Sequence, residues 1–173
     1  QRWREEISAQ EMASAIGNAG LDLNLDETDD DLTVLVMKGM KKKTVNIMVG
    51  PPADREDDRS YFETFFQKEG MHVVCGGTTA KLVADYLHTK VINIPDSGSE
   101  DVPAMSEIKG IDLVTEGLLT LQKLMEYYED FSEDRLYFNR LIKKKDGAAE
   151  LFRILFTEAT EINFFFGNAL NEN

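Results

Sequence analysis

The sequence has few cysteine and histidine residues, which form disulfide bonds and bind metal ions in many small folds. It contains one cysteine, Cys75, and two histidines, His72 and His88. A single cysteine cannot form an internal disulfide. No apolar run is long enough to cross a bilayer, and no signal-like segment begins the chain. We therefore expect a cytoplasmic protein that makes no use of a membrane.

Basic residues are also scarce. The chain has 19 Lys and Arg against 32 Asp and Glu, for a net charge of −13. Nucleic-acid backbones and anionic membrane surfaces attract basic proteins, so neither is expected as a partner. The 42% of apolar and 29% of charged residues are typical of a globular chain, and 173 residues suffice for one domain with an appendage.

The first forty residues carry one helical pattern and one strand pattern. Ser8 and Glu11 form a capping box, and apolar residues then recur at helical spacing as far as Gly20. An acidic loop follows. The run Leu32-Thr33-Val34-Leu35-Val36-Met37, with one polar residue, predicts a buried strand. A linker is predicted at Gly39 to Lys43.

From residue 44 onward, strand and helix patterns alternate. Strands are predicted at residues 45–49, 72–75, 91–94, 111–114 and 162–166. Helices are predicted to begin near Thr78 and at four capping residues, which are Asp54, Thr115, Ser132 and Asp146. This alternation predicts βαβ units, and hence an α/β domain with a mainly parallel sheet, helices on both faces and a Rossmann-like outline.

Apolar and aromatic stripes predict which side chains form the core. The helix after Thr115 is expected to turn four residues inward, which are Leu118, Leu121, Met125 and Tyr128. Aromatic side chains expected in the core are Phe62, Phe65, Phe66, Phe164, Phe165 and Phe166.

Four turns directly follow predicted strands. In Cys75-Gly76-Gly77-Thr78-Thr79, a strand meets a helix start whose unpaired N–H groups suit an anion or a polar ligand. In open α/β sheets, ligands bind outside the carboxyl ends of the strands, so the turns predict one ligand site. Its candidate residues are Gly50, Gly76, Gly77, Thr78, Thr79, Lys81, Thr115, Glu116, Gly167 and Asn168. The turn at Gly76 is equally a plain strand-to-helix connection, and this alternative stays open.

Known phosphate and nucleotide motifs do not fit these turns. The turn at Gly50-Pro51-Pro52 lacks a P-loop lysine, and residues 76–78 lack the dinucleotide glycine spacing. Cys75 precedes Lys81 much as the nucleophile precedes the arginine of cysteine-dependent phosphatases, but lysine cannot form the bidentate fork on phosphate. We therefore predict that Cys75 is a buried small residue and assign no catalytic residue.

The stretch Asp30-Asp31-Leu32-Thr33-Val34-Leu35-Val36, preceded by a capped helix, resembles the end of the metal-dependent protein phosphatases, the type 2C or PPM family. Its closest likeness is to the bacterial SpoIIE-type branch. The resemblance implies that Asp30 binds a Mn²⁺ or Mg²⁺ ion of a two-metal centre, with Asp31 beside it as a second candidate ligand. Two such ions activate water for phosphoester hydrolysis.

The motifs Gly50-Pro51-Pro52, Val74 to Ala80 and Gly110 to Gly117 are similar to the region that follows the phosphatase module in some SpoIIE-type proteins. The resemblance implies that residues 1–39 are the closing helix and strand of an incomplete phosphatase α/β sandwich, and that residues 44–173 are an accessory α/β domain. The family's other metal ligands lie upstream of the part that matches, so this chain is expected to be inactive alone and to hold no stable metal.

The resemblance further implies a phosphoprotein substrate for the full-length protein, which would extend upstream of Gln1. Its α/β domain would sense a small anionic ligand or dock a protein partner. Two alternatives stay open. One is a stand-alone α/β enzyme or small-ligand-binding protein that uses the glycine turn at residues 76–79, and the other is an interaction module.

Overall fold

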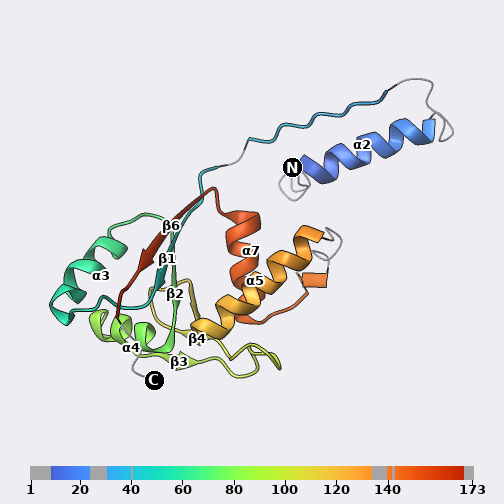
Figure 1. The fold of residues 1–173 in the computed structure, drawn as a ribbon. Coiled ribbons are helices and arrows are strands. Elements are labelled where there is room, and N and C mark those ends of the chain that lie inside the picture. The colour runs from blue at the N-terminus through green and yellow to red at the C-terminus, as the bar shows by residue number, and fades with distance from the viewer. Residues whose placement is uncertain (1–8, 24–30, 40, 134–139, 142, 170–173) are drawn as a thin grey trace. The chain divides into compact units, whose positions relative to one another are not determined.

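The structure is a computed structural model that describes residues 9–23, 31–39, 41–133, 140–141 and 143–169 (Figure 1). Ser8 of the predicted capping box and Asp30 of the predicted metal site lie outside these residues. The chain divides into two compact units, residues 1–41 and residues 42–173. Each unit is described by itself.

The first unit contains helix α2 (Ala9–Leu23) and an extended segment at residues 31–39. The predicted strand at Leu32 to Met37 is wrong, because this segment is in no strand and pairs with no strand among the described residues. Its side chains are not buried either, since Leu35 is 81% exposed and Met37 is 88% exposed. A β-branched run needs a neighbouring strand to bond its backbone groups, and sequence pattern alone cannot supply one.

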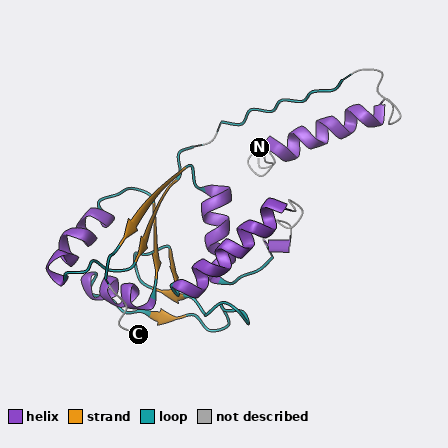
Figure 2. Cartoon of the chain, in the orientation of Figure 1, coloured by secondary structure: helices purple, strands orange, loops and turns teal. Residues whose placement is uncertain are grey.

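The second unit is built on a six-stranded sheet (Figure 2). Its strands are β1 (Thr44–Val49), β2 (Met71–Cys75), β3 (Ile92–Asn93), β4 (Ser106–Glu107), β5 (Leu113–Thr115) and β6 (Glu161–Phe166). The order is β3-β4-β5-β2-β1-β6. The four strands β5, β2, β1 and β6 are parallel, whereas β4 is antiparallel to both of its neighbours. The prediction of an α/β fold with a mainly parallel sheet is confirmed, and β4 is the strand that it missed.

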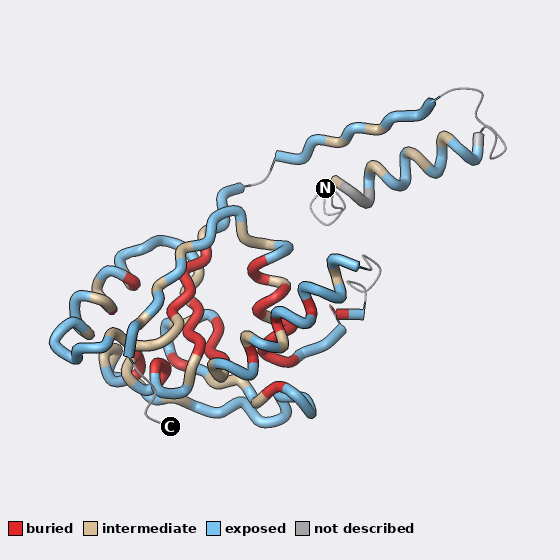
Figure 3. Tube along the Cα trace, in the orientation of Figure 1, coloured by how far each residue is buried: buried red, intermediate tan, exposed pale blue. Residues whose placement is uncertain are grey.

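Helices pack on both faces of this sheet. They are a 3₁₀ turn (Arg55–Asp57), α3 (Asp58–Phe66), α4 (Gly77–Tyr86), α5 (Leu118–Glu133) and α7 (Gly147–Arg153), which continues as a π-helix (Ile154–Glu158). Side chains of α3 and α4 join Met48, Val74 and Val114 of the strands in one core cluster. Side chains of α5 and α7 join Val45, Ile47 and Val73 in the other. The central strands are therefore buried on both faces (Figure 3).

One polar side chain is buried within β1, the strand between β2 and β6. Asn46 is fully buried in β1, and its amide donates to the carbonyl oxygens of Glu69 and Met71, each at 3.2 Å. It also accepts a hydrogen bond of 2.9 Å from the amide of Asn163 in β6. Because its donors and its acceptor are all engaged, burial of this amide carries little penalty. The contact ties the edge strand β6 to β1.

Two of the predicted helix caps are wrong and one is confirmed. Thr115 belongs to β5, and the Glu116 carboxylate accepts from the backbone N–H of Leu119 in its place, at 3.2 Å. Ser132 lies inside α5, where its hydroxyl donates to the Glu129 carbonyl. Asp146 does cap α7, since it accepts from the N–H groups of Ala148 and Ala149. Asp54 precedes the 3₁₀ turn but makes no side-chain capping bond.

The predicted inner face of α5 is wrong at three of its four residues, whereas Leu121 does pack against the core. The buried residues of this helix are Thr120, Leu124 and Tyr127, whereas Leu118 is 68% exposed and Met125 is 55% exposed. Apolar residues occur around most of this helix, so the periodic pattern did not single out one face.

The prediction that all the listed aromatic residues lie in the core fails in β6. Phe62 and Phe65 of α3 are buried, and Phe165 packs against the Phe65 ring at a centroid distance of 5.2 Å. The two neighbouring phenylalanines of β6, Phe164 and Phe166, are 54% and 64% exposed. The reason is topological, because β6 is the last strand of the sheet and, among the described residues, has a neighbouring strand on one side only.

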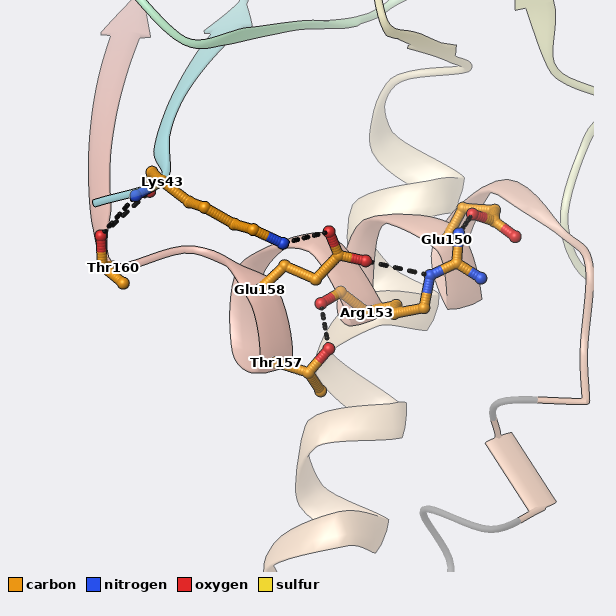
Figure 4. A network of polar contacts seen from close by, with 6 residues as sticks. All are labelled: Lys43, Glu150, Arg153, Thr157, Glu158 and Thr160. Atoms are coloured by element: carbon orange, nitrogen blue, oxygen red, sulfur yellow. Dashed lines mark hydrogen bonds and ion pairs between the residues drawn. The ribbon is translucent and has the colours of Figure 1, made fainter. Parts of the chain in front are cut away.

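A polar network holds the amino edge of the sheet together (Figure 4). The backbone N–H of Lys43 donates to the Thr160 hydroxyl at 2.8 Å, which joins the start of β1 to the start of β6. The Lys43 ammonium and the Arg153 guanidinium both reach the Glu158 carboxylate, each at 3.5 Å. Arg153 also pairs with Glu150 on α7. The network therefore links the π-helix to both strands.

Candidate functional site

The four parallel strands end in line. In the strand registers Val49 lies opposite both Cys75 and Phe166, and Cys75 lies opposite Thr115. The turns that follow β1, β2, β5 and β6 therefore meet at one edge, which we call the carboxyl edge. Their predicted convergence is confirmed, while the binding of a ligand there stays a prediction.

The glycine turn after β2 lies in the middle of the carboxyl edge. Gly76 has a φ of +119°, which a residue with a side chain rarely adopts, and its N–H donates to the Thr115 carbonyl at 3.0 Å. Gly77 and Thr78 are exposed at the start of α4, and Lys81 is exposed one turn later. Thr79 is buried and packs toward Gly76. Of the two threonines, only Thr78 presents its side chain to solvent.

The turn after β5 is closed by its own side chains. The Thr115 hydroxyl is buried and donates to the Glu116 carbonyl at 2.9 Å. Glu116 is half-buried and caps Leu119, as described above. The backbone of Gly117 lies against Gly76, since a Cβ at Gly117 would stand 3.3 Å from the Gly76 Cα. These residues support the glycine turn and line none of the hollows described below.

The turns after β1 and β6 pack directly against each other. Gly167 donates to the Val49 carbonyl at 2.9 Å, and Ala169 donates to the Pro51 carbonyl at 3.2 Å. Gly50 has a φ of +78°, and a Cβ at Gly167 would overlap the Pro51 carbonyl group. Both glycines are thus required for close backbone approach, and this requirement explains them without a ligand.

A crevice of about 570 Å³ opens beside these two turns, between α3 and the end of β6. Its lining residues are Pro52, Ala53, Asp54, Asp57, Ser60, Tyr61, Thr64, Phe165, Phe166 and Asn168. Asn168 is the one predicted ligand residue among them. The glycine turn at residues 76–79 does not line this crevice.

The crevice combines carboxylates, hydroxyls and aromatic rings. Asp54 and Asp57 are both exposed, and neither carboxylate caps the helical turn that it precedes. Tyr61 is half-buried, and burial raises its pKa to about 12, so the hydroxyl stays protonated as a donor near neutral pH. The same hydroxyl lies 3.5 Å from the Gly50 carbonyl oxygen. These groups could hold a ligand that carries hydrogen-bond donors and an apolar surface.

Asp54 was expected only as a helix cap, and no ligand-binding role was expected for Tyr61. One signal was present for both, because they follow the turn after β1, and ligands of open α/β sheets bind beyond the carboxyl ends of the strands. Strand order decides which turns border a crevice, and strand order cannot be read from a local pattern.

Cys75 is buried at the end of β2, as predicted. Burial raises the pKa of its thiol, a hydrogen bond with Thr115 lowers it in part, and the nearby Glu116 charge adds a smaller rise, so that the pKa is about 11. A thiol with a raised pKa forms little thiolate at neutral pH, and thiolate is the nucleophile. The structure therefore supports no nucleophilic role for Cys75.

The predicted metal site is only half described. Asp30 lies outside the described residues, and Asp31 is exposed at the start of the extended segment. Among the described residues there is no group of three His, Cys, Asp or Glu side chains that could hold a metal ion. A two-metal centre needs several such ligands, so the described residues do not fit one.

A second hollow, of about 290 Å³, lies between α5 and the loop at residues 98–101. Its floor holds Tyr127, which is buried and donates to the buried carboxylate of Asp146 at 3.2 Å. The Lys144 ammonium donates to the same phenol oxygen at 3.1 Å and lies 4.3 Å from the ring centroid. No sequence pattern had marked this cluster as functional.

Comparisons with protein-family models, with curated proteins and with solved structures found no match for this chain. Within the part of the chain that the structure describes, no helix has both the length and the apolar character needed to cross a membrane.

Proposed function

We propose that this chain is a C-terminal portion of a SpoIIE-type metal-dependent serine/threonine phosphatase. In this proposal residues 1–39 close the catalytic module, and residues 44–173 form a Rossmann-like accessory domain that binds a small polar ligand. The phosphatase part rests on the sequence resemblance at residues 30–36.

One structural observation supports the phosphatase part. The extended segment at residues 31–39 exposes Leu35 and Met37, and α2 exposes Met12 at 44% and Ile16 at 50%. Isolated apolar side chains on a surface are ordinary, but here a helix and a β-branched segment both expose theirs, with no core over them among the described residues. A helix and an extended segment that pack into a larger sandwich would carry this pattern.

The crevice beside β1 and β6 carries the ligand-binding part. After β1 the chain moves through α3 to β2 and later to β5, and it then returns to β6 on the other side of β1. The connections on the two sides pack on opposite faces of the sheet. Ligands of open α/β sheets bind where the strand order reverses in this way, and the crevice lies at this point.

A phosphatase assay tests the first part. This chain with Mn²⁺ is expected to leave a phosphoserine peptide unhydrolysed, because the described residues hold no cluster for a two-metal centre. Robust turnover would overturn the claim that the catalytic module is incomplete. The coding sequence upstream of Gln1 is expected to contain the remaining acidic motifs of the module, and their absence there would remove the phosphatase assignment.

Ligand-dependent thermal stabilisation tests the second part. The panel includes phosphorylated metabolites, which suit the helix start at Gly77, and organic amines, which suit the carboxylates of Asp54 and Asp57. Thr78→Ala should abolish a shift produced at the glycine turn, whereas Asp57→Asn with Tyr61→Phe should abolish one produced at the crevice. If no ligand raises the unfolding temperature, the domain is better explained as a protein-interaction module. If a ligand stabilises the chain and the upstream coding sequence lacks the phosphatase motifs, a stand-alone α/β binding protein or enzyme would be favoured.

A further inference from the structure

Strand β6 ends the sheet on one side, and no other strand of the described residues pairs with its outer backbone edge. Gly167 donates to the Val49 carbonyl and Glu161 donates to the Lys43 carbonyl, so residues with odd numbers direct their backbone groups toward β1. Backbone groups alternate in direction along a strand. The N–H and C=O groups of Ile162, Phe164 and Phe166 therefore point outward, away from the sheet.

The same three residues carry the exposed apolar side chains of β6. Ile162 is 36% exposed, Phe164 is 54% exposed and Phe166 is 64% exposed. The two phenylalanine rings are stacked, with centroids 5.5 Å apart and planes 8° from parallel. Natural edge strands are usually protected by lysine, proline or a bulge, and residues 162–166 contain none of these. Both the backbone and the side chains of this edge are open to another strand.

We infer that this edge pairs with the β6 edge of a second copy of the chain, antiparallel and centred on Phe164, so that two sheets join into one. A two-fold axis at Phe164 places Phe164 opposite its copy and Ile162 opposite Phe166. All of these residues have outward backbone groups, so each opposing pair exchanges two hydrogen bonds, about six in all. A register shifted by one residue would set outward groups against inward groups and lose these bonds.

Charge favours a second copy at this edge. A chain with a net charge of −13 repels another copy over most of its surface, but residues 162–169 carry no charge. The one charged residue of the strand, Glu161, is paired with Lys42 at 2.7 Å within its own chain. In the proposed register Glu161 faces Gly167 of the second copy, so the two glutamates do not meet.

Sedimentation and light scattering over a wide concentration range test this inference on the full chain. The fraction of dimer should rise with concentration. Phe164→Lys places two ammonium groups opposite each other at the axis and should weaken dimerisation at least about tenfold. Leu118→Lys is the matched control, because Leu118 is also highly exposed but lies on α5. This variant should dimerise as strongly as the unchanged chain.

Two further variants separate pairing from folding. Phe164→Pro removes an outward N–H and leaves the bonds to β1 in place, as proline on an edge strand usually does, and it should also yield monomer. Phe164→Cys should form a disulfide between copies on mild oxidation, since opposing residues of this kind have Cα atoms about 5.5 Å apart. The native Cys75 is buried and should not react.

The register has its own check. Ile162→Cys should cross-link to Phe166→Cys in a mixture and not to itself. A monomer at every concentration would overturn the inference, as would a dimer that Phe164→Lys and Phe164→Pro leave intact. Self-cross-linking of Ile162→Cys in preference to Phe164→Cys would overturn the proposed pairing. If the lysine and proline variants lose their circular dichroism signal, they are unfolded and do not report on pairing. The cross-linking of the cysteine variants then tests the inference.

Discussion

The Tyr127 hydroxyl donates to the Asp146 carboxylate at 3.2 Å, and both residues are almost completely buried. The other oxygen of Asp146 caps α7 through the N–H groups of Ala148 and Ala149. A single buried carboxylate thus holds the start of α7 and the middle of α5 together. The Lys144 ammonium in turn donates a hydrogen bond to the Tyr127 hydroxyl oxygen.

Tyr127→Phe should lower the free energy of unfolding by about 1.5 to 3 kcal/mol, because a buried carboxylate loses one of its hydrogen-bond donors. Urea unfolding followed by circular dichroism measures the change. Tyr128→Phe is the control, because it makes the same substitution, with the same change in helix propensity, at the next residue of α5. The Tyr128 side chain is 42% exposed. An equal effect of the two substitutions would contradict the role assigned to Tyr127.

The Cys75 thiol should make stability fall at alkaline pH. Its pKa is raised from 9.0 to about 11 in the fold, so the stabilisation is complete below pH 9.0 and is lost as the pH rises toward about 11. The expected loss across this window is about 2 to 3 kcal/mol. Urea unfolding at increasing pH should show this loss in the native chain and a smaller one in Cys75→Ala. Parallel profiles for the two proteins would contradict the assignment, because other alkaline titrations, including that of Tyr61, are common to both.

Two glycines of the carboxyl edge should respond differently to alanine. Gly167→Ala should destabilise the domain by about 2 kcal/mol or more, since the new methyl group would overlap the Pro51 carbonyl. Gly77→Ala should change stability by less than about 0.5 kcal/mol, because nothing lies within 4 Å of the added atom. Gly77→Ala is therefore the better probe of ligand binding at the glycine turn. Thermal unfolding of both variants measures the difference, and a Gly77→Ala variant that unfolds readily would contradict it.

The ion pairs at the amino edge should contribute little. The side chains of Lys43 and Glu158 are 54% and 35% exposed, and exposed pairs are typically worth less than about 1 kcal/mol. A double-mutant cycle of Lys43→Ala and Glu158→Gln should give a coupling free energy below that value, decreasing further in salt. A coupling well above it would show that the network in Figure 4 is a main link between the π-helix and the sheet.

Local patterns identified most elements of the second unit. Alternation located β1, β2 and β6 to within a residue, and Asp146 was found as a cap because Asp at a helix start has a local physical cause. Patterns failed where a distant partner decides. Residues 32–37 have the composition of a strand but no strand beside them, and α5 has apolar residues on several faces, so only packing selected Tyr127 and Leu124.

The candidate site was predicted in the same uneven way. Four turns were expected at one edge, and the strand registers bring them together. Of the ten candidate ligand residues, however, only Asn168 lines the crevice, and Tyr61 and Asp57 had not been proposed. Glycine at Gly50 and Gly167 signalled close backbone approach, which a sequence cannot distinguish from space for a ligand.

The sequence by itself determined the acidic charge, the α/β class and the turns that end the strands, because composition, periodicity and glycine conformation act locally. Only the tertiary structure decided the order of the strands, with β6 at the edge and β1 beside it. That order opens a crevice beside Tyr61 and leaves Phe164 and Phe166 exposed. Both results depend on which strands are neighbours, and contacts between residues more than a hundred positions apart fix this, such as the one between Asn46 and Asn163.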